Sequence, residues 1–235
     1  MKKKEKYLFY GLAIVAIAAV VLSAVMSYHI FIIDNAVQDN QEGAHGHMLL
    51  MHFDSQIAMQ FMDKNNDGKC DSCGMAVEMC IEDGQMQCDM DTGSIIGVIG
   101  SGHSHADFKV YVNGKYADFA NSEYYMKSRF MHVDDNVNKE DASGVLHMHA
   151  KGVPLWIFFE SIGGRFNETC IAISDKQVFC NNASKSLKFY VNGNPNNGFG
   201  NYAFNQNDKI LISFGDVNED IQYQLEAVTD FSRDH

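Results

Sequence analysis

Two His-x-His pairs lie in the middle of the 235-residue chain: His103 with His105, and His147 with His149. If each pair lies on a β-strand, its two imidazoles project from the same face of that strand. Two imidazoles side by side have the spacing that a metal ion needs. The pairs therefore predict a metal site, with copper or zinc as the ion, because imidazole suits both.

His132 and Asp134 lie between the two pairs and are expected to supplement them. Half of the ten histidines fall between residues 102 and 152. The alternative interpretation is that they are polar positions on the open face of a half-covered sheet. Repetition of the His-x-His pattern within one small region favours the metal site.

Four further candidate ligands are the cysteines Cys70, Cys73, Cys80 and Cys88. The Cys-x-x-Cys-Gly sequence is typical of a zinc knuckle, and four thiolates can complete a tetrahedral site. In an oxidising compartment the same cysteines could instead form two disulfides. The methionines between them suggest copper capture as a further alternative, since thioether and thiolate suit Cu(I). A structural site, whether zinc or disulfides, ranks ahead of copper here.

A polar loop overlaps the first cysteines and resembles the calcium loops of EF-hand and dockerin-type proteins. Gly68 occupies its sharp-turn position 6, and Gly74 occupies position 12, where those loops have a bidentate Glu. Calcium binding is therefore expected to be weak, or to use another carboxylate such as Glu78. The residues at positions 1, 3, 5, 7 and 9 are Asp63, Asn65, Asp67, Lys69 and Asp71.

The histidines need strands to position them, and the sequence pattern predicts several. Residues 108–114 and 187–193 each alternate in polarity and end in an Asn-Gly turn. Residues 145–150 form a third strand, with His147 and His149 on one face. A helix follows over 153–163, and 209–215 form a last buried strand. The predicted fold is α+β, a β-grasp-like sheet with one covering helix.

Cys170 and Cys180 flank a predicted hairpin, and we expect them to form a disulfide. Asn167 and Asn182 each begin an Asn-x-Ser/Thr sequence. This is the acceptor sequence for N-linked glycosylation, so both are candidate glycosylation sites.

The N-terminal sequence predicts a membrane anchor. Residues 7–33 contain no charged residue, and a helix of roughly 20 apolar residues crosses a bilayer. Lysines precede this run and acidic residues follow it, which places the N-terminus in the cytoplasm and the C-terminal domain outside. A cleavable signal peptide is the alternative. We expect a single-pass protein of the cell membrane, with the membrane as its partner.

The predicted organisation after the N-terminal helix has four regions. Following the transmembrane anchor at 1–33, the regions are a linker with a short amphipathic helix at 34–62, a Cys/Met-rich segment with the calcium-type loop at 63–92, a His-rich α+β domain at 103–216 and an acidic tail at 217–235.

The net charge of the chain is −12. Such a charge repels nucleic acid, so nucleic-acid binding is not expected.

The pattern over residues 103–215 resembles a group of uncharacterised archaeal membrane-anchored proteins with His-x-His-rich ectodomains. The resemblance is carried by His-Ala-Asp-Phe-Lys-Val-Tyr-Val-Asn-Gly, by Val-Leu-His-Met-His-Ala-x-Gly before a Phe-rich helix, and by Asp-Lys-Ile-Leu-Ile-Ser-Phe-Gly. It implies a fold and a location, and no activity. These proteins have His-x-His-Asp where this chain has Met131 before His132, which replaces one imidazole by a thioether.

The function predicted from the sequence is metal binding outside the cytoplasm, for capture, delivery or sensing of copper or zinc. One alternative is a cell-surface interaction or scaffold module with structural metal or disulfides. A metal-dependent enzyme is a second alternative, but the sequence contains no His-Glu-x-x-His, Gly-x-Ser-x-Gly or Walker A motif. We therefore favour a protein without enzymatic activity.

Overall fold

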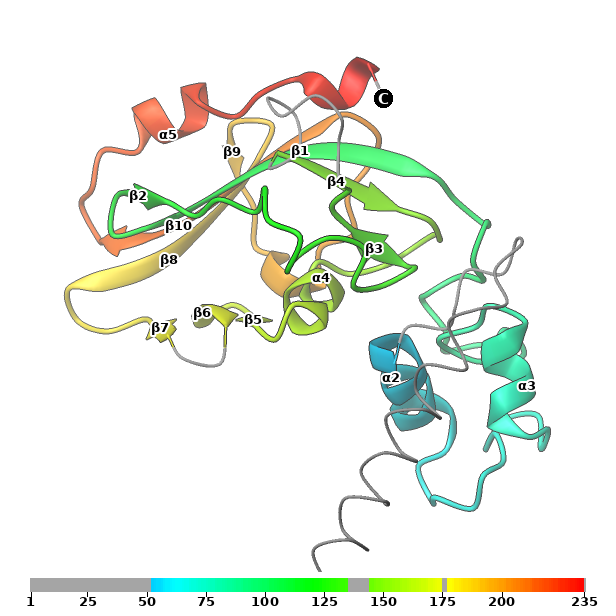
Figure 1. The fold of residues 1–235 in the computed structure, drawn as a ribbon. Coiled ribbons are helices and arrows are strands. Elements are labelled where there is room, and N and C mark those ends of the chain that lie inside the picture. Colours follow the sequence, from blue (N-terminus) through cyan, green and yellow to red (C-terminus); the bar gives the residue numbers. More distant parts are fainter. Residues whose placement is uncertain (1–51, 135–143, 175–176, 235) are drawn as a thin grey trace, which may run out of the picture. The chain divides into compact units, whose positions relative to one another are not determined.

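The computed structural model describes residues 52–134, 144–174 and 177–234 (Figure 1). All of them belong to one compact unit that spans 50–235. Its first half contains α2 (His52–Met62), α3 (Val77–Glu82), β1 (Ser104–Val112), β2 (Lys115–Tyr116), β3 (Met131–His132) and β4 (Val145–Met148). Its second half contains α4 (Trp156–Ser161), β5 (Arg165–Phe166), β6 (Cys170–Ser174), β7 (Gln177–Cys180), β8 (Lys185–Val191), β9 (Asn194–Pro195), η1 (Phe199–Asn201), β10 (Asp208–Asp216), α5 (Gln222–Glu226) and η2 (Phe231–Asp234).

The main sheet has seven strands in the order β3-β4-β1-β10-β8-β9, with β2 also paired to β1. Strand β1 is central: it pairs antiparallel with β4 and parallel with β10. A second sheet contains β5, β6 and β7. The described part of the chain is therefore mixed α/β, with two sheets.

The predicted α+β fold, with one β-grasp-like sheet and one covering helix, is wrong. The strand pattern showed where strands lie but not which strands pair. The Cys170–Cys180 hairpin pairs with the short strand β5 directly after α4, so it forms its own sheet. The main sheet gains β3 instead, which the sequence pattern did not predict.

The two Asn-Gly turns are confirmed. Asn113 and Gly114 have φ of 51° and 73°, and β1 pairs with β2 across them. Asn192 and Gly193 have φ of 52° and 78° between β8 and β9. Positive φ at both central residues defines the type I′ turn that matches strand twist, which is why asparagine and glycine occupy these positions.

The two faces of β1 are packed against different parts of the chain. Ala106, Phe108 and Val110 face the larger core, in which α4 contributes Ile157, Phe158 and Phe159. Tyr111 faces the other way, into a smaller cluster with Leu211, Ile221 and Val228. Asp107 lies on that same second face, where it accepts hydrogen bonds from Thr229, Phe231 and Ser232. The predicted acidic tail thus contains ordered structure against the sheet.

The residues between the Cys/Met-rich segment and the His-rich domain hydrogen-bond to the chain just after β4. The Gly97 and Gly100 amides donate to the carbonyls of Lys151 and His149, at 2.8 and 2.7 Å. A Cβ on Gly152, whose φ is +72°, would lie 2.0 Å from the Ile95 carbonyl oxygen. Only glycine allows this close backbone approach, which fixes the chain just before His103 beside the end of β4.

The predicted membrane anchor is not found in the described residues. Across 52–134, 144–174 and 177–234, no helix has both the length and the apolar character needed to cross a bilayer. The longest of the helices there, α2, has 11 residues. The prediction of a single-pass membrane protein therefore does not hold for the described chain, and the predicted span 7–33 lies outside it.

Candidate metal centre

Three histidines lie in one row across the main sheet. His105 on β1 is opposite His147 on β4, and His147 is opposite His132 on β3. Residues directly opposite one another on neighbouring strands have Cβ atoms about 5 Å apart. The strand register therefore brings together imidazoles that are separated by up to 42 positions in the sequence.

His103 and His149 extend this row at its solvent side. The His103 ring stacks on the His149 ring with centroids 4.8 Å apart, and it lies 4.6 Å from the His105 ring. The His149 ring is 4.9 Å from the His132 ring. All five predicted histidines therefore lie together, and we call this group, with Asp134, the His cluster.

Ligand atoms of three members come especially close. Nitrogen atoms of His103, His105 and His147 lie within 4.8 Å of one another. Three nitrogen atoms at such separations can surround one ion, since zinc and copper bind imidazole nitrogen at about 2.0–2.1 Å. The group could therefore hold a metal ion, as predicted from the sequence.

Asp134 contacts two histidines of the cluster. Its Oδ1 lies 3.0 Å from His132 Nε2, and its Oδ2 lies 3.5 Å from His147 Nδ1. His132 Nδ1 lies 2.7 Å from the Ser128 carbonyl oxygen, which can only accept. Nδ1 therefore carries the hydrogen, and Nε2 must bind either a proton or a metal ion where it faces the carboxylate. A backbone carbonyl that fixes the ring in this way is common for metal-binding histidines.

The electrostatics of the cluster favour the neutral form of His149. Burial, followed by the positive charges of His132 and His103, lowers the pKa of His149 to about 4. The hydrogen bond from His132 lowers the pKa of Asp134. Near neutral pH, His149 is therefore unprotonated and Asp134 is ionised, which are the forms that bind cations.

Access to the cluster is from one side. His105, His132 and His147 are buried, His149 is half-buried and His103 is exposed. The buried members provide a fixed geometry, while the exposed His103 marks the side that an ion can reach from solvent. An ion held by the cluster would therefore be closest to solvent at His103.

The cysteines form a second group. Sγ atoms of Cys70, Cys73 and Cys88 lie within 4.8 Å of one another, and Cys80 interacts with all three. All four are free thiols, so the structure does not contain the two disulfides that the sequence left open. Burial raises the pKa of Cys80 to about 12 and that of Cys88 to about 11. We call this group the Cys cluster.

The calcium-type loop is held together by its own hydrogen bonds. Asp63 accepts from the amides of Asp67 and Gly68, at 3.0 and 2.8 Å. Asp71 accepts from the Lys64 amide at 3.0 Å, and Asn65 accepts from Asp67. These bonds explain why small polar residues occupy the loop, and calcium binding there stays a prediction.

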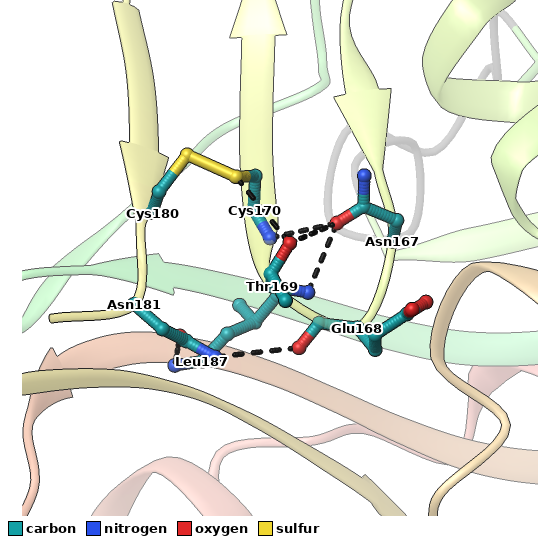
Figure 2. The surroundings of a disulfide bond; sticks show 7 residues. All are labelled: Asn167, Glu168, Thr169, Cys170, Cys180, Asn181 and Leu187. Carbon is teal, nitrogen blue, oxygen red and sulfur yellow. Dashed lines mark hydrogen bonds between the residues drawn. A yellow bond between two sulfur atoms is a disulfide. The ribbon is translucent and has the colours of Figure 1, made fainter.

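The predicted disulfide is confirmed. Cys170 on β6 and Cys180 on β7 are opposite one another and are bonded (Figure 2). Beside them, Asn167 Oδ1 accepts from Thr169 and from the Cys170 amide. Asn182 Oδ1 accepts in the same way from Ser184 and Lys185. Both candidate glycosylation sites thus lie in turns, and glycosylation stays a prediction.

Sequence reasoning missed the residues that support the His cluster. Ser128 contributes a backbone carbonyl, which no side-chain pattern can indicate. Asp54 on α2 accepts hydrogen bonds from Ser128 Oγ at 2.5 Å and from the Arg129 amide at 2.7 Å. Gln206 accepts from the His105 amide. Asp54 is 74 positions from Ser128 in the sequence, and Gln206 is 101 positions from His105. Only the fold reveals these contacts.

Comparison of the chain with protein-family models, with curated proteins and with solved structures found no match. The function therefore has to be argued from the geometry of the two clusters.

Proposed function

We propose that the protein binds a copper or zinc ion in the His cluster and that it acts in metal capture, delivery or sensing. One observation carries this proposal: three adjacent strands and the residues next to them bring five imidazoles and a carboxylate together. Imidazole nitrogen and carboxylate oxygen are ligands for both ions.

The contacts of His132 support a cation at this point. Its Nδ1 hydrogen is committed to the Ser128 carbonyl, and its Nε2 lies near both Asp134 and His149 Nε2, the latter at 3.4 Å. A cluster of imidazoles without an ion would bring several lone pairs together, which is unfavourable away from water. An ion shared by these atoms removes that conflict.

The exposure of His103 favours exchange over a purely structural role. Structural zinc sites are closed by four protein ligands, whereas sites that exchange a ligand or ion keep an accessible position. The exposed imidazole provides such a position beside three buried ones.

The test is a metal titration of the full chain, purified without a His-tag or chelator. Copper and zinc are added separately to the wild type and to the variant His103→Ala/His149→Ala, with calorimetry and elemental analysis as readouts. These two side chains are the more accessible ones, so the variant keeps the buried row. We expect its affinity to fall roughly tenfold or more. His52→Ala, which changes an exposed histidine on α2, is the control and should bind as the wild type does.

Two results would contradict the proposal. One is a wild-type chain that takes up neither ion beyond the amount held by the cysteines. The other is equal affinity in the wild type and the double variant. Either would leave the His cluster as a structural feature and favour an interaction or scaffold module.

A further inference from the structure

The Cys cluster has a geometry that the proposed function does not use. Three of its sulfur atoms lie within 4.8 Å of one another, and the Cys80 side chain hydrogen-bonds with that of Cys73. Cys170 and Cys180 of the same chain are disulfide-bonded, while these four thiols are free. Four convergent free thiols are the ligand set of a closed tetrahedral site.

The backbone around the cluster is shaped for thiolates. Residues 69 and 76 form an isolated bridge, the Cys70 amide donates to the Met75 carbonyl and the Gly74 amide donates back to Cys70. Gly74 has a φ of +73°, so this tight turn requires glycine. The Met75 amide then donates to the Cys73 sulfur, and the Met90 amide donates to the Cys88 sulfur in the same way. Hydrogen bonds of this kind stabilise negative charge on sulfur.

The hydrophobic cluster around these cysteines is small. Its buried residues are Ala58, Met62, Cys70, Val77, Cys80, Ile81 and Cys88. Three of these seven are cysteines of the cluster, and none of them forms a disulfide. A metal ion bound to the thiols would therefore link the chain at the centre of this cluster.

We propose that Cys70, Cys73, Cys80 and Cys88 bind one zinc ion as four thiolates, and that this ion holds the segment from 63 to 92 in its fold. Each thiol releases its proton to solvent as the ion binds, so the site carries a net charge of −2. This site is separate from the His cluster and closed by its four ligands, and it therefore stabilises structure instead of exchanging metal.

The ion should be detectable in the unmodified chain. The full protein, isolated without reductant or chelator, is analysed by native mass spectrometry and elemental analysis. Its free thiols are then titrated with an alkylating reagent before and after a strong chelator. We expect one zinc ion per chain, slow alkylation of the four thiols before chelation and fast alkylation after it. Proteolysis within 63–92 should also become faster after chelation.

Variants assign the ion to the cysteines. Cys73→Ser changes the least buried ligand and should lose this zinc ion, whereas His103→Ala/His149→Ala should retain it. Met79→Ala changes an exposed thioether in the same segment and should retain it as well. Cobalt reconstitution should give the thiolate-to-metal absorption of a tetrahedral site in the wild type and a much weaker band in Cys73→Ser.

Three outcomes would overturn the inference. If peptide mapping finds disulfides among the four cysteines, covalent bonds and not a zinc ion hold the segment together. Alkylation at equal rates with and without chelator would show that no metal shields the thiols. If the wild type contains copper and Met79→Ala loses it, the segment instead captures copper with help from a thioether. Because the His-cluster variant is measured in parallel, failure here is distinguishable from failure of the proposed function.

Discussion

A single carboxylate, Asp134, joins two buried histidines of the His cluster. It contacts His132 and His147, which lie on two different strands. Its pKa is lowered by the hydrogen bond from His132, so it carries its negative charge through the neutral range. That charge would offset the positive charge of a bound ion, which a neutral imidazole ligand cannot do.

We therefore expect Asp134→Asn to weaken metal binding roughly tenfold. The amide keeps the size of the side chain but removes its charge, and stability without metal should change little because Asp134 is partly exposed. Calorimetric titration with copper and zinc measures the change, with Glu168→Gln as the charge-matched control at an exposed site. An unchanged affinity in Asp134→Asn would exclude the carboxylate from the ligand set.

Tyr202, which follows η1 and donates a hydrogen bond to Asp208 at the start of β10, gives a pH prediction. Burial, followed by its hydrogen bond to Asp208, raises the pKa of Tyr202 to about 12. The folded state thus favours the neutral phenol. Its contribution to stability is complete below the ordinary pKa of about 10 and is lost as the pH rises through about 12.

The difference in free energy of unfolding between the wild type and Tyr202→Phe should therefore be constant below pH 10. It should shrink between about pH 10 and 12. Urea denaturation at a series of pH values measures it, and a difference that stays constant to pH 12 would contradict the assignment. The remaining partners of Asp208, Asn192 and Asn205, should keep the variant folded.

At the scale of elements, α2 holds the turn that orients His132. Asp54 lies buried on α2 and accepts from Ser128 and Arg129, and the Arg129 side chain reaches the Ile81 carbonyl on α3. Desolvation by burial raises the pKa of Asp54, so these hydrogen bonds are needed to offset the cost of burying it. The contacts physically link the cysteine-containing segment with the His cluster.

Asp54→Ala should lower the free energy of unfolding by about 3 kcal/mol, because it leaves the Ser128 hydroxyl and the Arg129 amide and guanidinium without their partner. Metal affinity of the His cluster should fall as well, since the turn at 128 loosens. Urea denaturation and metal titration measure the two effects. Glu168→Ala, an exposed change, should alter neither. A stable variant with weak metal binding would instead make Asp54 a positioning residue alone.

Local elements were predictable because their signals are local. The Asn-Gly dipeptides at 113 and 192 mark hairpins, and the i, i+2 spacing of His147 and His149 indicated that both belong to one site. Pairing between strands was not predictable in this way. Strand β3 has two residues, too few for a pattern, yet its position beside β4 brings His132 into the cluster. The Ser128 carbonyl and the distant Asp54 leave no signal in the sequence at all.

At the scale of the whole molecule, the central pairing joins distant parts of the chain. Strand β1 lies between β4 and β10, and its parallel pairing with β10 begins at Ala106 opposite Asp208. Asp107 of β1 also binds the residues just before the C-terminus. The strand that carries His103 and His105 to the site is thus supported by the last part of the chain.

This arrangement has a consequence for how the protein is made. During synthesis, β1 emerges long before β10, so the edge of β1 that later pairs with β10 waits with its amides and carbonyls unpaired. Such edges pair with other chains. A chain that stops after Asn207 should therefore aggregate when refolded by dilution, measured by light scattering, whereas one that stops after Asp234 should refold as the whole chain does. A monomeric, folded product of the shorter chain would show that β1 does not need β10 to avoid aggregation.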